Sequence, residues 1–438
     1  MEILGPTVRS NEVLKTSSIL QTIFIGFVVI GVLNKENYFM SISALLCILI
    51  YSFLTIDSKI LAIFFLLPFQ SYFVLIGNFT VTTVCGLILL ITFVYFRRKI
   101  DVKTLLSMVI FLIFQLLSSF IFQSNLFQSI SFVCTLLLMY YLVEHFNGNR
   151  KDYYVPAAKI FIFAVLLSST LAIAPMLSDY LSGISMPRFV GLWTNPNTLS
   201  TLLNISIALV LILTTEKRIS IYLSSFCISL LGIYILLTYS RSAIFGLISI
   251  LVIYTTMILF NKNGVYKKNS VNSTILKLLT LFCVIFISIF MYAYIIAPII
   301  EKRGLIYTEN SDFTHDRFSN LVIDYKWVIN ELDGFPLFSG FGINNSFKSI
   351  STIGKFTAYS THNTYAEMLL DSGFFGFSCW AYFLYRNLKI HFHSFLRLRL
   401  LFVYVMLFYS LSSLMHTSDY AYMLLALISC YDEKINIL

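Results

Sequence analysis

Apolar residues fill this chain in long runs, and short polar stretches separate the runs. An α-helix rises 1.5 Å per residue, so a run of about 20 apolar residues crosses the hydrocarbon core of a bilayer. We therefore predict an all-α fold, a polytopic transmembrane helix bundle of about 12–14 spans, with 1–438 as a single integral-membrane domain. The predicted spans are 17–33, 38–55, 60–76, 79–96, 104–122, 126–143, 157–175, 199–214, 219–238, 243–260, 275–298, 364–385, 400–415 and a short last one, 420–431.

The composition excludes a water-soluble domain, because 58% of the residues are hydrophobic and only 12% are charged. A net charge of +9 would suggest nucleic acid as the partner of a soluble chain. Here the basic residues lie in loops between apolar runs, so they indicate membrane topology and not nucleic-acid binding. The seven cysteines fall in or at the ends of apolar runs and none is paired at metal-ligand spacing, so we predict neither a disulfide framework nor a zinc site.

Positive charge alternates between successive loops. Most of the 30 Lys and Arg lie in one set of loops, and the positive-inside rule places that set in the cytoplasm together with both termini. The other set, on the outer side, contains Arg188, Arg241 and Arg317. Positive charge is uncommon in outer loops, so these three arginines are candidates for function.

Two outer segments contain candidate residues, and the second is long enough to indicate function by its length. The segment 176–198 contains Arg188, and 299–362 leads into His362. Within the second segment, apolar residues recur at helical spacing over 315–332 with polar residues on the other side. We predict an amphipathic helix there, lying flat in the headgroup region.

Arg241 stands where one predicted span ends and the next begins, in the stretch TYSRSAIFG. The start of the second helix offers free N–H groups beside the guanidinium, and this combination suits an anion. The alternative is that Arg241 only anchors the chain at the membrane surface. For Arg317 the alternative is a contact with a lipid headgroup.

Polar residues open the apolar segment THNTYAEMLLDSGFFGF. His362 lies at the outer water–membrane boundary, and Asn363, Glu367 and Asp371 follow at a spacing of four, on one helix face. Asp371 lies about 13 Å into the span, so it must face protein, a cavity or a cation. A lone membrane histidine is ordinarily structural, but this neighbourhood favours a functional one.

Four stretches, in this order, resemble the O-antigen polymerase and O-antigen ligase superfamily of bacterial envelope glycosyltransferases. RFVGLWTNPNTLS (188–200) resembles its Arg-Gly-Asn-Pro-Asn outer loop, and TYSRSAIFG (238–246) resembles its Ser-Arg-Ser helix break. DRF, YKW and PLFSGFG, within 316–342, resemble the run before its signature. THNTYAEMLLDSGFFGF (361–377) resembles the signature itself, with Asp371 where Glu is more usual. The first six spans match only in being hydrophobic.

The resemblance implies substrates that are glycans on undecaprenyl diphosphate, handled at the periplasmic face of the bacterial inner membrane; a polymerase would use them as both donor and acceptor. It makes His362 the general base and places the diphosphate on Arg188 and Arg241, assisted by Arg317. Residues in supporting roles would be Asn363, Glu367, Asp371 and Asn197. Membrane lipid and a chain-length regulator are candidate partners, and nucleic acid is not.

The residue types agree with this chemistry. A diphosphate leaving group needs fixed cations, and Arg supplies them through two-pronged hydrogen bonds. An attacking sugar hydroxyl must lose its proton, and a neutral histidine, with an ordinary pKa near 6.5, is the usual base. No Asp-x-Asp motif or histidine cluster indicates a metal or cofactor, so we expect a metal-independent glycosyltransferase in which arginines take the place of a metal.

Three functions remain open at this point. We favour an O-antigen or capsular polysaccharide polymerase, because the chain is a single membrane body with no large added outer domain. An O-antigen ligase would pass the glycan to a lipid A core by the same chemistry, and lipopolysaccharide biosynthesis includes both activities. A transporter or flippase of lipid-linked sugars would need no general base, and it would ordinarily show buried charges over several spans or repeated halves.

Overall fold

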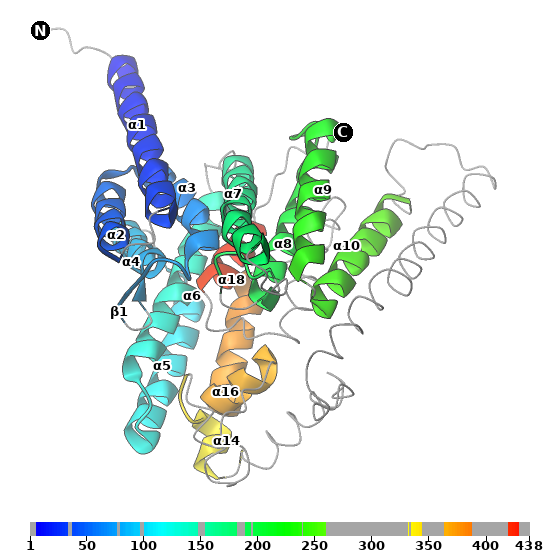
Figure 1. The fold of residues 1–438 in the computed structure, drawn as a ribbon. Coiled ribbons are helices and arrows are strands. Elements are labelled where there is room, and N and C mark those ends of the chain that lie inside the picture. Colours follow the sequence, from blue (N-terminus) through cyan, green and yellow to red (C-terminus); the bar gives the residue numbers. More distant parts are fainter. Residues whose placement is uncertain are drawn as a thin grey trace, which may run out of the picture.

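A computed structural model describes residues 6–33, 37–76, 79–96, 100–147, 154–181, 189–193, 196–238, 240–259, 332, 334–343, 363–387 and 419–428. These residues are almost entirely helical (Figure 1). The elements are α1 (Pro6–Leu33), α2 (Asn37–Phe53), α3 (Ile56–Leu66), η1 (Leu67–Phe69), β1 (Val74–Ile76), β2 (Phe79–Thr80), α4 (Val81–Tyr95), α5 (Val102–Phe122), α6 (Leu126–Asn147), α7 (Tyr154–Leu181), α8 (Pro196–Thr215), α9 (Ile221–Thr238), α10 (Arg241–Leu259), α14 (Phe335–Ser339), α16 (Thr364–Asn387) and α18 (Asp419–Ile428).

The described helices confirm the all-α polytopic bundle. Five of them, α5 to α9, are long and apolar enough to cross a membrane, and shorter apolar segments lie in α1, α2, α4 and α10. Most bounds agree with the predicted spans to within a few residues, although α7 continues six residues beyond its predicted end. The predicted spans 275–298 and 400–415 and the amphipathic helix at 315–332 lie outside the described residues. The full span count therefore stays a prediction.

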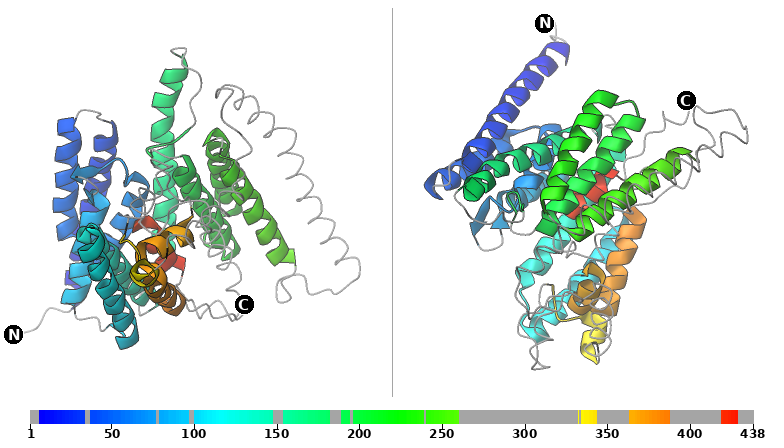
Figure 2. Two further views of the ribbon diagram at one scale, coloured as in Figure 1. Left: turned by 90° about the horizontal axis from the view of Figure 1, so that it is seen from below. Right: turned by 45° about the vertical axis from the view of Figure 1, so that its right-hand side comes forward.

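The helix α8 forms the centre of the bundle. Every side chain from Leu199 to Leu213 is buried, and the helix packs on α7, α9 and α10. The helix α8 carries no charged residue, as expected in a core, whereas α5 leaves large side chains such as Leu106 and Phe120 exposed, as expected for a surface that meets lipid. The short α18 is also buried and lies near the middle of the molecule in each view (Figure 2).

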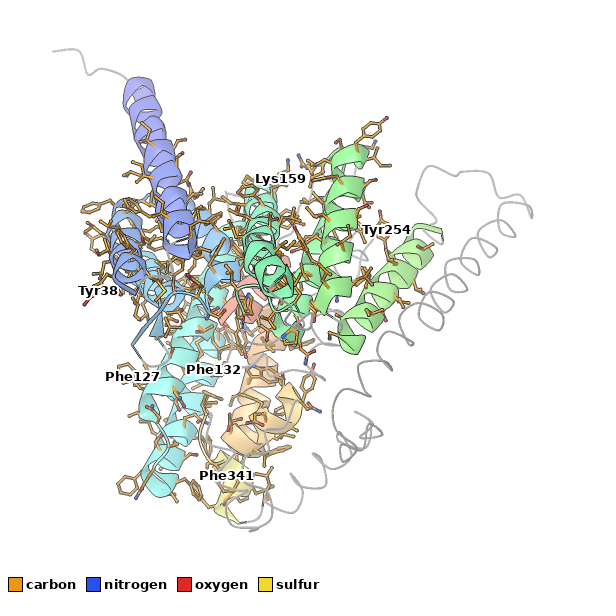
Figure 3. The ribbon with its side chains drawn as sticks, in the orientation of Figure 1. Tyr38, Phe127, Phe132, Lys159, Tyr254 and Phe341 are labelled. Carbon is orange, nitrogen blue, oxygen red and sulfur yellow. The ribbon has the colours of Figure 1, made fainter. Side chains whose placement is uncertain are left out.

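Aromatic contacts join α18 to its neighbours. The Tyr422 ring packs edge-on against Phe132 of α6, with centroids 5.6 Å apart (Figure 3 marks Phe132). The Tyr422 hydroxyl accepts a hydrogen bond from Trp380 Nε1 of α16 at 3.0 Å. The described part of α18 has ten residues, and its side chains from Ala421 to Leu427 are almost all buried, so this part belongs to the interior of the bundle.

The predicted third span, 60–76, is not a single helix. The helix α3 ends at Leu66, η1 continues to Phe69, and the chain then turns into a two-stranded antiparallel ribbon of β1 and β2. Pro68 explains the early end, because proline has no N–H for the helical hydrogen bond and its ring clashes with the preceding turn. Thr80 then begins α4 by accepting a hydrogen bond from the N–H of Thr83 at 3.2 Å.

An ion pair joins the helix ends that the charge pattern predicts to be cytoplasmic. Asp101 caps α5 by accepting from the N–H of Thr104, and its Oδ2 lies 2.7 Å from a guanidinium nitrogen of Arg386 in α16. The Thr104 N–H, helped by Arg386, lowers the pKa of the Asp101 carboxyl. The pair connects the beginning of α5 to the end of α16, two helices that pack closely along each other.

Candidate active site

The predicted helix break at Arg241 is a real junction. The helix α9 ends at Thr238 and α10 begins at Arg241. Ser240 Oγ accepts a hydrogen bond from the N–H of Ala243 at 3.3 Å, which caps α10. Arg241 therefore occupies the first turn of a helix, where the backbone N–H groups favour an anion. The Arg241 side chain lies outside what the structure describes.

Asn197 links the start of α8 to this junction. Its Oδ1 accepts a hydrogen bond from Ser240 Oγ at 2.8 Å, so one amide holds the residue that caps α10. Two turns further along α8, the fully buried Asn204 donates from Nδ2 to the carbonyl of Ala243 at 2.9 Å. Two hydrogen bonds, one to Asn197 and one from Asn204, therefore join the first part of α8 to the start of α10. This contact gives Asn197 a structural reason for its place in the motif.

The loop that follows Arg188 is tied to the same junction. The N–H of Phe189 donates to the carbonyl of Leu237 at 3.1 Å, and the Phe189 ring lies against Tyr234 with centroids 5.8 Å apart. Leu237 stands four residues before Arg241 in the sequence. Arg188 itself lies outside the described residues. The residue next to Arg188 is therefore one hydrogen bond away from the end of α9.

A second attachment holds the far side of this loop. Ser71 Oγ donates to the carbonyl of Leu192 at 2.7 Å, and Trp193 Nε1 donates to the carbonyl of Pro68 at 3.1 Å. The turn after η1 therefore supports the outer loop, a role that sequence reasoning missed. The proline and the polar residues that interrupt the predicted third span were the available signal.

Asn363 begins α16 as its N-cap. Its Oδ1 accepts hydrogen bonds from the N–H of Tyr365 at 2.9 Å and of Ala366 at 3.3 Å, and only 1% of the residue is exposed. His362, the residue before this cap, lies outside the described residues, as does Arg317. Asn363 therefore has a structural role in fixing the start of the helix that follows the proposed base.

The two acidic residues of the predicted stripe are both enclosed. Glu367 is 5% exposed and Asp371 is fully buried, as expected for carboxylates in an apolar segment. Asn363, Glu367 and Asp371 lie along the first two turns of α16. This helix packs chiefly on α5 and α14, whereas α10 packs chiefly on α8 and α9. The described part of the candidate site thus consists of two regions.

The sequence predicts one continuous helix over 364–385, and this prediction is wrong at Gly373. Gly373 has φ 62° and ψ −174°, so α16 consists of two helical pieces that meet there. The N–H groups of Phe341 and Gly342 donate to the carbonyls of Leu370 and Asp371, each at 2.8 Å. The segment after α14 thereby takes up carbonyls that the break would leave without a partner. Phe341 lies beside α14 at this end of the molecule (Figure 3).

Two glycines allow this close backbone contact. A Cβ on Gly373 would lie 2.5 Å from the carbonyl carbon of Phe338, and a Cβ on Gly340 would overlap the backbone of Asp371 and Ser372. Both glycines have positive φ, at 62° and 68°. The Gly-x-x-Gly part of the signature therefore marks a helix break that is docked on the Ser-Gly-Phe-Gly turn.

We expect Gly373→Ala to destabilise the protein markedly. A side chain at this φ and ψ costs about 1–3 kcal/mol before any clash is counted, and the Cβ would also meet the backbone of Phe338. Gly232→Ala in α9 is the matched control, because a Cβ there has no neighbour within 4 Å and alanine favours a helix. Thermal unfolding of the detergent-solubilised proteins measures both. Equal melting temperatures for the two variants would contradict the break.

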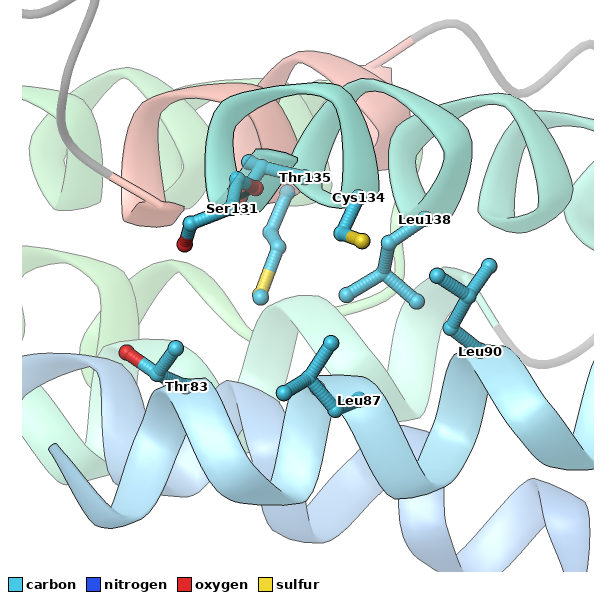
Figure 4. Close-up of a pocket in the computed structure, with 9 residues that line it drawn as sticks. Thr83, Leu87, Leu90, Ser131, Cys134, Thr135 and Leu138 are labelled. Carbon is cyan, nitrogen blue, oxygen red and sulfur yellow. Dashed lines mark hydrogen bonds between the residues drawn. The ribbon is translucent and has the colours of Figure 1, made fainter. Parts of the chain in front are cut away.

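One groove away from these residues is unsuited to a diphosphate. A groove between α4 and α6 is lined by Thr83, Leu87, Leu90, Ser131, Cys134, Thr135 and Leu138, with Gly86 and Met423 (Figure 4). None of these side chains is charged, so the groove lacks the cations that a diphosphate needs. Among the described residues, His, Cys, Asp and Glu form no group of three or more that could hold a metal ion.

A known protein family matches the part of the chain that follows the Arg188 loop. Residues 226–381 match the profile of an enzyme family described as O-antigen ligase, and no curated protein matches the chain significantly. The matched region begins in α9 and ends in α16, so it contains the helix break at Arg241 and the His-Asn motif, whereas the Arg188 loop precedes it. The resemblance is thereby confirmed: over residues 226–381, this multi-pass membrane chain carries the O-antigen ligase region of the O-antigen polymerase and ligase superfamily.

Proposed function

We propose that this chain is a metal-independent glycosyltransferase that polymerises undecaprenyl-diphosphate-linked repeat units of an O-antigen or capsular polysaccharide. It would act at the periplasmic face of the inner membrane, with both termini in the cytoplasm. Donor and acceptor would both be lipid-linked glycans, and a chain-length regulator remains a candidate partner.

One observation carries the proposal. The outer loop after Arg188 is tied to the helix junction before Arg241 by two hydrogen bonds, one from Phe189 to Leu237 and one from Ser240 to Asn197. Arg188 precedes Phe189 and Arg241 follows Ser240 in the sequence. These ties support a single outer site to which both guanidinium groups contribute. A lone topology anchor would not need this linkage.

The proposed reaction breaks one bond and forms one. His362 takes the proton from a hydroxyl at the nonreducing end of the acceptor repeat unit, and the oxygen then bonds to the anomeric carbon of the donor glycan. The bond from that carbon to the diphosphate oxygen breaks, and undecaprenyl diphosphate leaves. Arg188 and Arg241, assisted by Arg317, stabilise the negative charge that the diphosphate gains. Glu367 and Asp371 have supporting roles.

An O-antigen ligase is the second candidate, and it is the activity named in the description of the matched family. The donor, the base and the arginines would be the same. Only the acceptor would differ, because a ligase passes the finished glycan to a lipid A core. The identity of the acceptor therefore separates the two functions.

Purified protein in vesicles, supplied with undecaprenyl-diphosphate-linked repeat units alone, tests the proposal. We expect lipid-linked products of two, three and more repeat units, with one undecaprenyl diphosphate released for each new glycosidic bond. Release that begins only when lipid A core is added, with transfer of one glycan block, would establish the ligase instead. Movement of intact lipid-linked units across the bilayer, without any new bond, would identify a transporter.

A further inference from the structure

We propose that Gln115, in the middle of α5, is a positioning residue that holds the outer turn 338–343 on the break in α16. This inference rests on the proposed function, because the first half of α16 follows directly after His362 and Asn363. Gln115 is fully buried, although it lies in an otherwise apolar run. A polar side chain in such a place has a cost and therefore needs a reason.

Gln115 uses both ends of its amide. Nε2 donates to the carbonyl of Asp371 at 3.3 Å, immediately before the break in α16. Oε1 accepts from the N–H of Ile343 at 3.2 Å, just after the glycine turn, and from Ser129 Oγ of α6 at 3.4 Å. One side chain therefore joins α5, α6, α16 and the outer turn. A leucine would make none of these bonds, and a carboxylate would place a negative charge beside the Asp371 carbonyl.

Two neighbouring serines of α5, Ser118 and Ser119, differ in whether they hydrogen-bond to the outer turn. One turn along α5, the fully buried Ser118 donates from Oγ to the carbonyl of Ser339 at 2.7 Å. The next residue, Ser119, bonds instead within its own region, to the carbonyl of Gln115 at 2.8 Å and to Ser124 Oγ at 2.8 Å. The two serines thus offer a matched pair, since the hydrogen bond to the outer turn comes from Ser118, whereas those of Ser119 stay within 115–124.

The position of the break determines the position of the helix start. Residues 364–372 form about two and a half turns, roughly 13 Å, between the break and the cap at Asn363. A rigid helical piece transmits a displacement at Asp371 to Asn363, and so to the residue that precedes it. Gln115 would therefore determine where the proposed base meets the acceptor, without touching substrate itself. Misplacement by about 1 Å is enough to reduce catalysis strongly.

Gln115→Leu tests the proposal, with Ser118→Ala and Ser119→Ala as the matched pair. For Gln115→Leu we expect the rate of polymerisation per folded protein to fall about 10-fold, while the apparent KM for the lipid-linked repeat unit changes less than about 2-fold. Ser118→Ala should reduce the rate several-fold in the same manner, and Ser119→Ala should leave it unchanged. A merely space-filling Gln115 would not give this separation of rate from KM.

A second measurement reports the attachment directly and needs no activity. Ile343 is 2% exposed, so the thiol that Ile343→Cys introduces should react slowly with a maleimide reagent in the solubilised protein. We expect Gln115→Leu to raise this labelling rate about 10-fold over the rate measured with Gln115 in place, after subtraction of labelling at the natural cysteines. Ser118→Ala should raise it too, and Ser119→Ala should not.

Two results would overturn the positioning role: a Gln115→Leu protein with the parent rate, or one with a reduced rate in which the introduced thiol stays as protected as before. If Gln115→Leu does not accumulate, the comparison of Ser118→Ala with Ser119→Ala decides in its place. If the parent chain makes no polymer, the proposed function fails, and the labelling comparison still decides whether Gln115 holds the turn.

Discussion

Replacing His362 with alanine is expected to lower the rate of polymer synthesis about 100-fold or more while leaving the amount of protein in the membrane unchanged. A positioned general base contributes about 10²- to 10⁴-fold to a rate, and the variant loses that contribution entirely. The neighbouring Asn363 caps α16 through its own side chain, so the helix should still begin correctly without the imidazole.

The polymer ladder from a deletion strain that carries each variant provides the measurement, with the membrane protein level determined alongside. His391→Ala is the matched control, because the charge pattern predicts that His391 lies on the cytoplasmic side. It should give normal ladders. A near-normal ladder from a well-expressed His362→Ala protein would show that His362 has a structural role only.

Exchanging either proposed phosphate-binding arginine for lysine is expected to remove most of the activity, although the positive charge is kept. Lysine cannot present a planar pair of donors to two phosphate oxygens. Losing one charge-assisted hydrogen bond costs about 1.5–3 kcal/mol, which corresponds to about 10- to 150-fold in rate. Arg241→Lys and Arg188→Lys should therefore each insert normally and yet fail to make long polymer.

The controls for these exchanges are Lys302→Ala and Lys348→Ala, two positions in the outer segment 299–362 that lie outside the motifs. They remove a charge and should cost little. The ladder assay applies unchanged. Full ladders from both arginine-to-lysine variants would exclude the diphosphate role for these two positions, and the catalytic proposal would then rest on His362 alone.

Much of the fold could be predicted, because the length of an apolar run and the charge of its flanking loops are local properties. The helices α5, α8 and α9 begin and end within three residues of the predicted bounds. The helix break at Gly373 could not be predicted in this way. Its neighbours Phe374 and Phe375 are apolar, so the run continues through it, and the turn that docks on the break lies some 30 residues earlier in the sequence.

The residues of the candidate site also differ in whether the sequence alone could reveal them. The motif around Asn197, Ser240 and Arg241 was visible in the sequence because its residues are polar and lie at the ends of apolar runs. Gln115 and Ser71 were missed for the opposite reason. Each lies in an apolar region that matches the family only in being hydrophobic, and the partner of each is more than one hundred residues away. Sequence spacing carries no information about such pairs.

The distance in sequence between α5 and its partners also determines the order of assembly. The outer turn follows Ser118 by 221 residues, and Asp371 follows Gln115 by 256. At about 5–20 residues per second, a ribosome needs roughly 10–50 s to synthesise the chain between them. Throughout that time the Gln115 amide lies in the bilayer without α16. Ser129 follows Gln115 by only 14 residues and is available almost at once. The pair α5 and α6 would then enter the membrane as a hairpin that already shields its polar group, ready for a helix made much later.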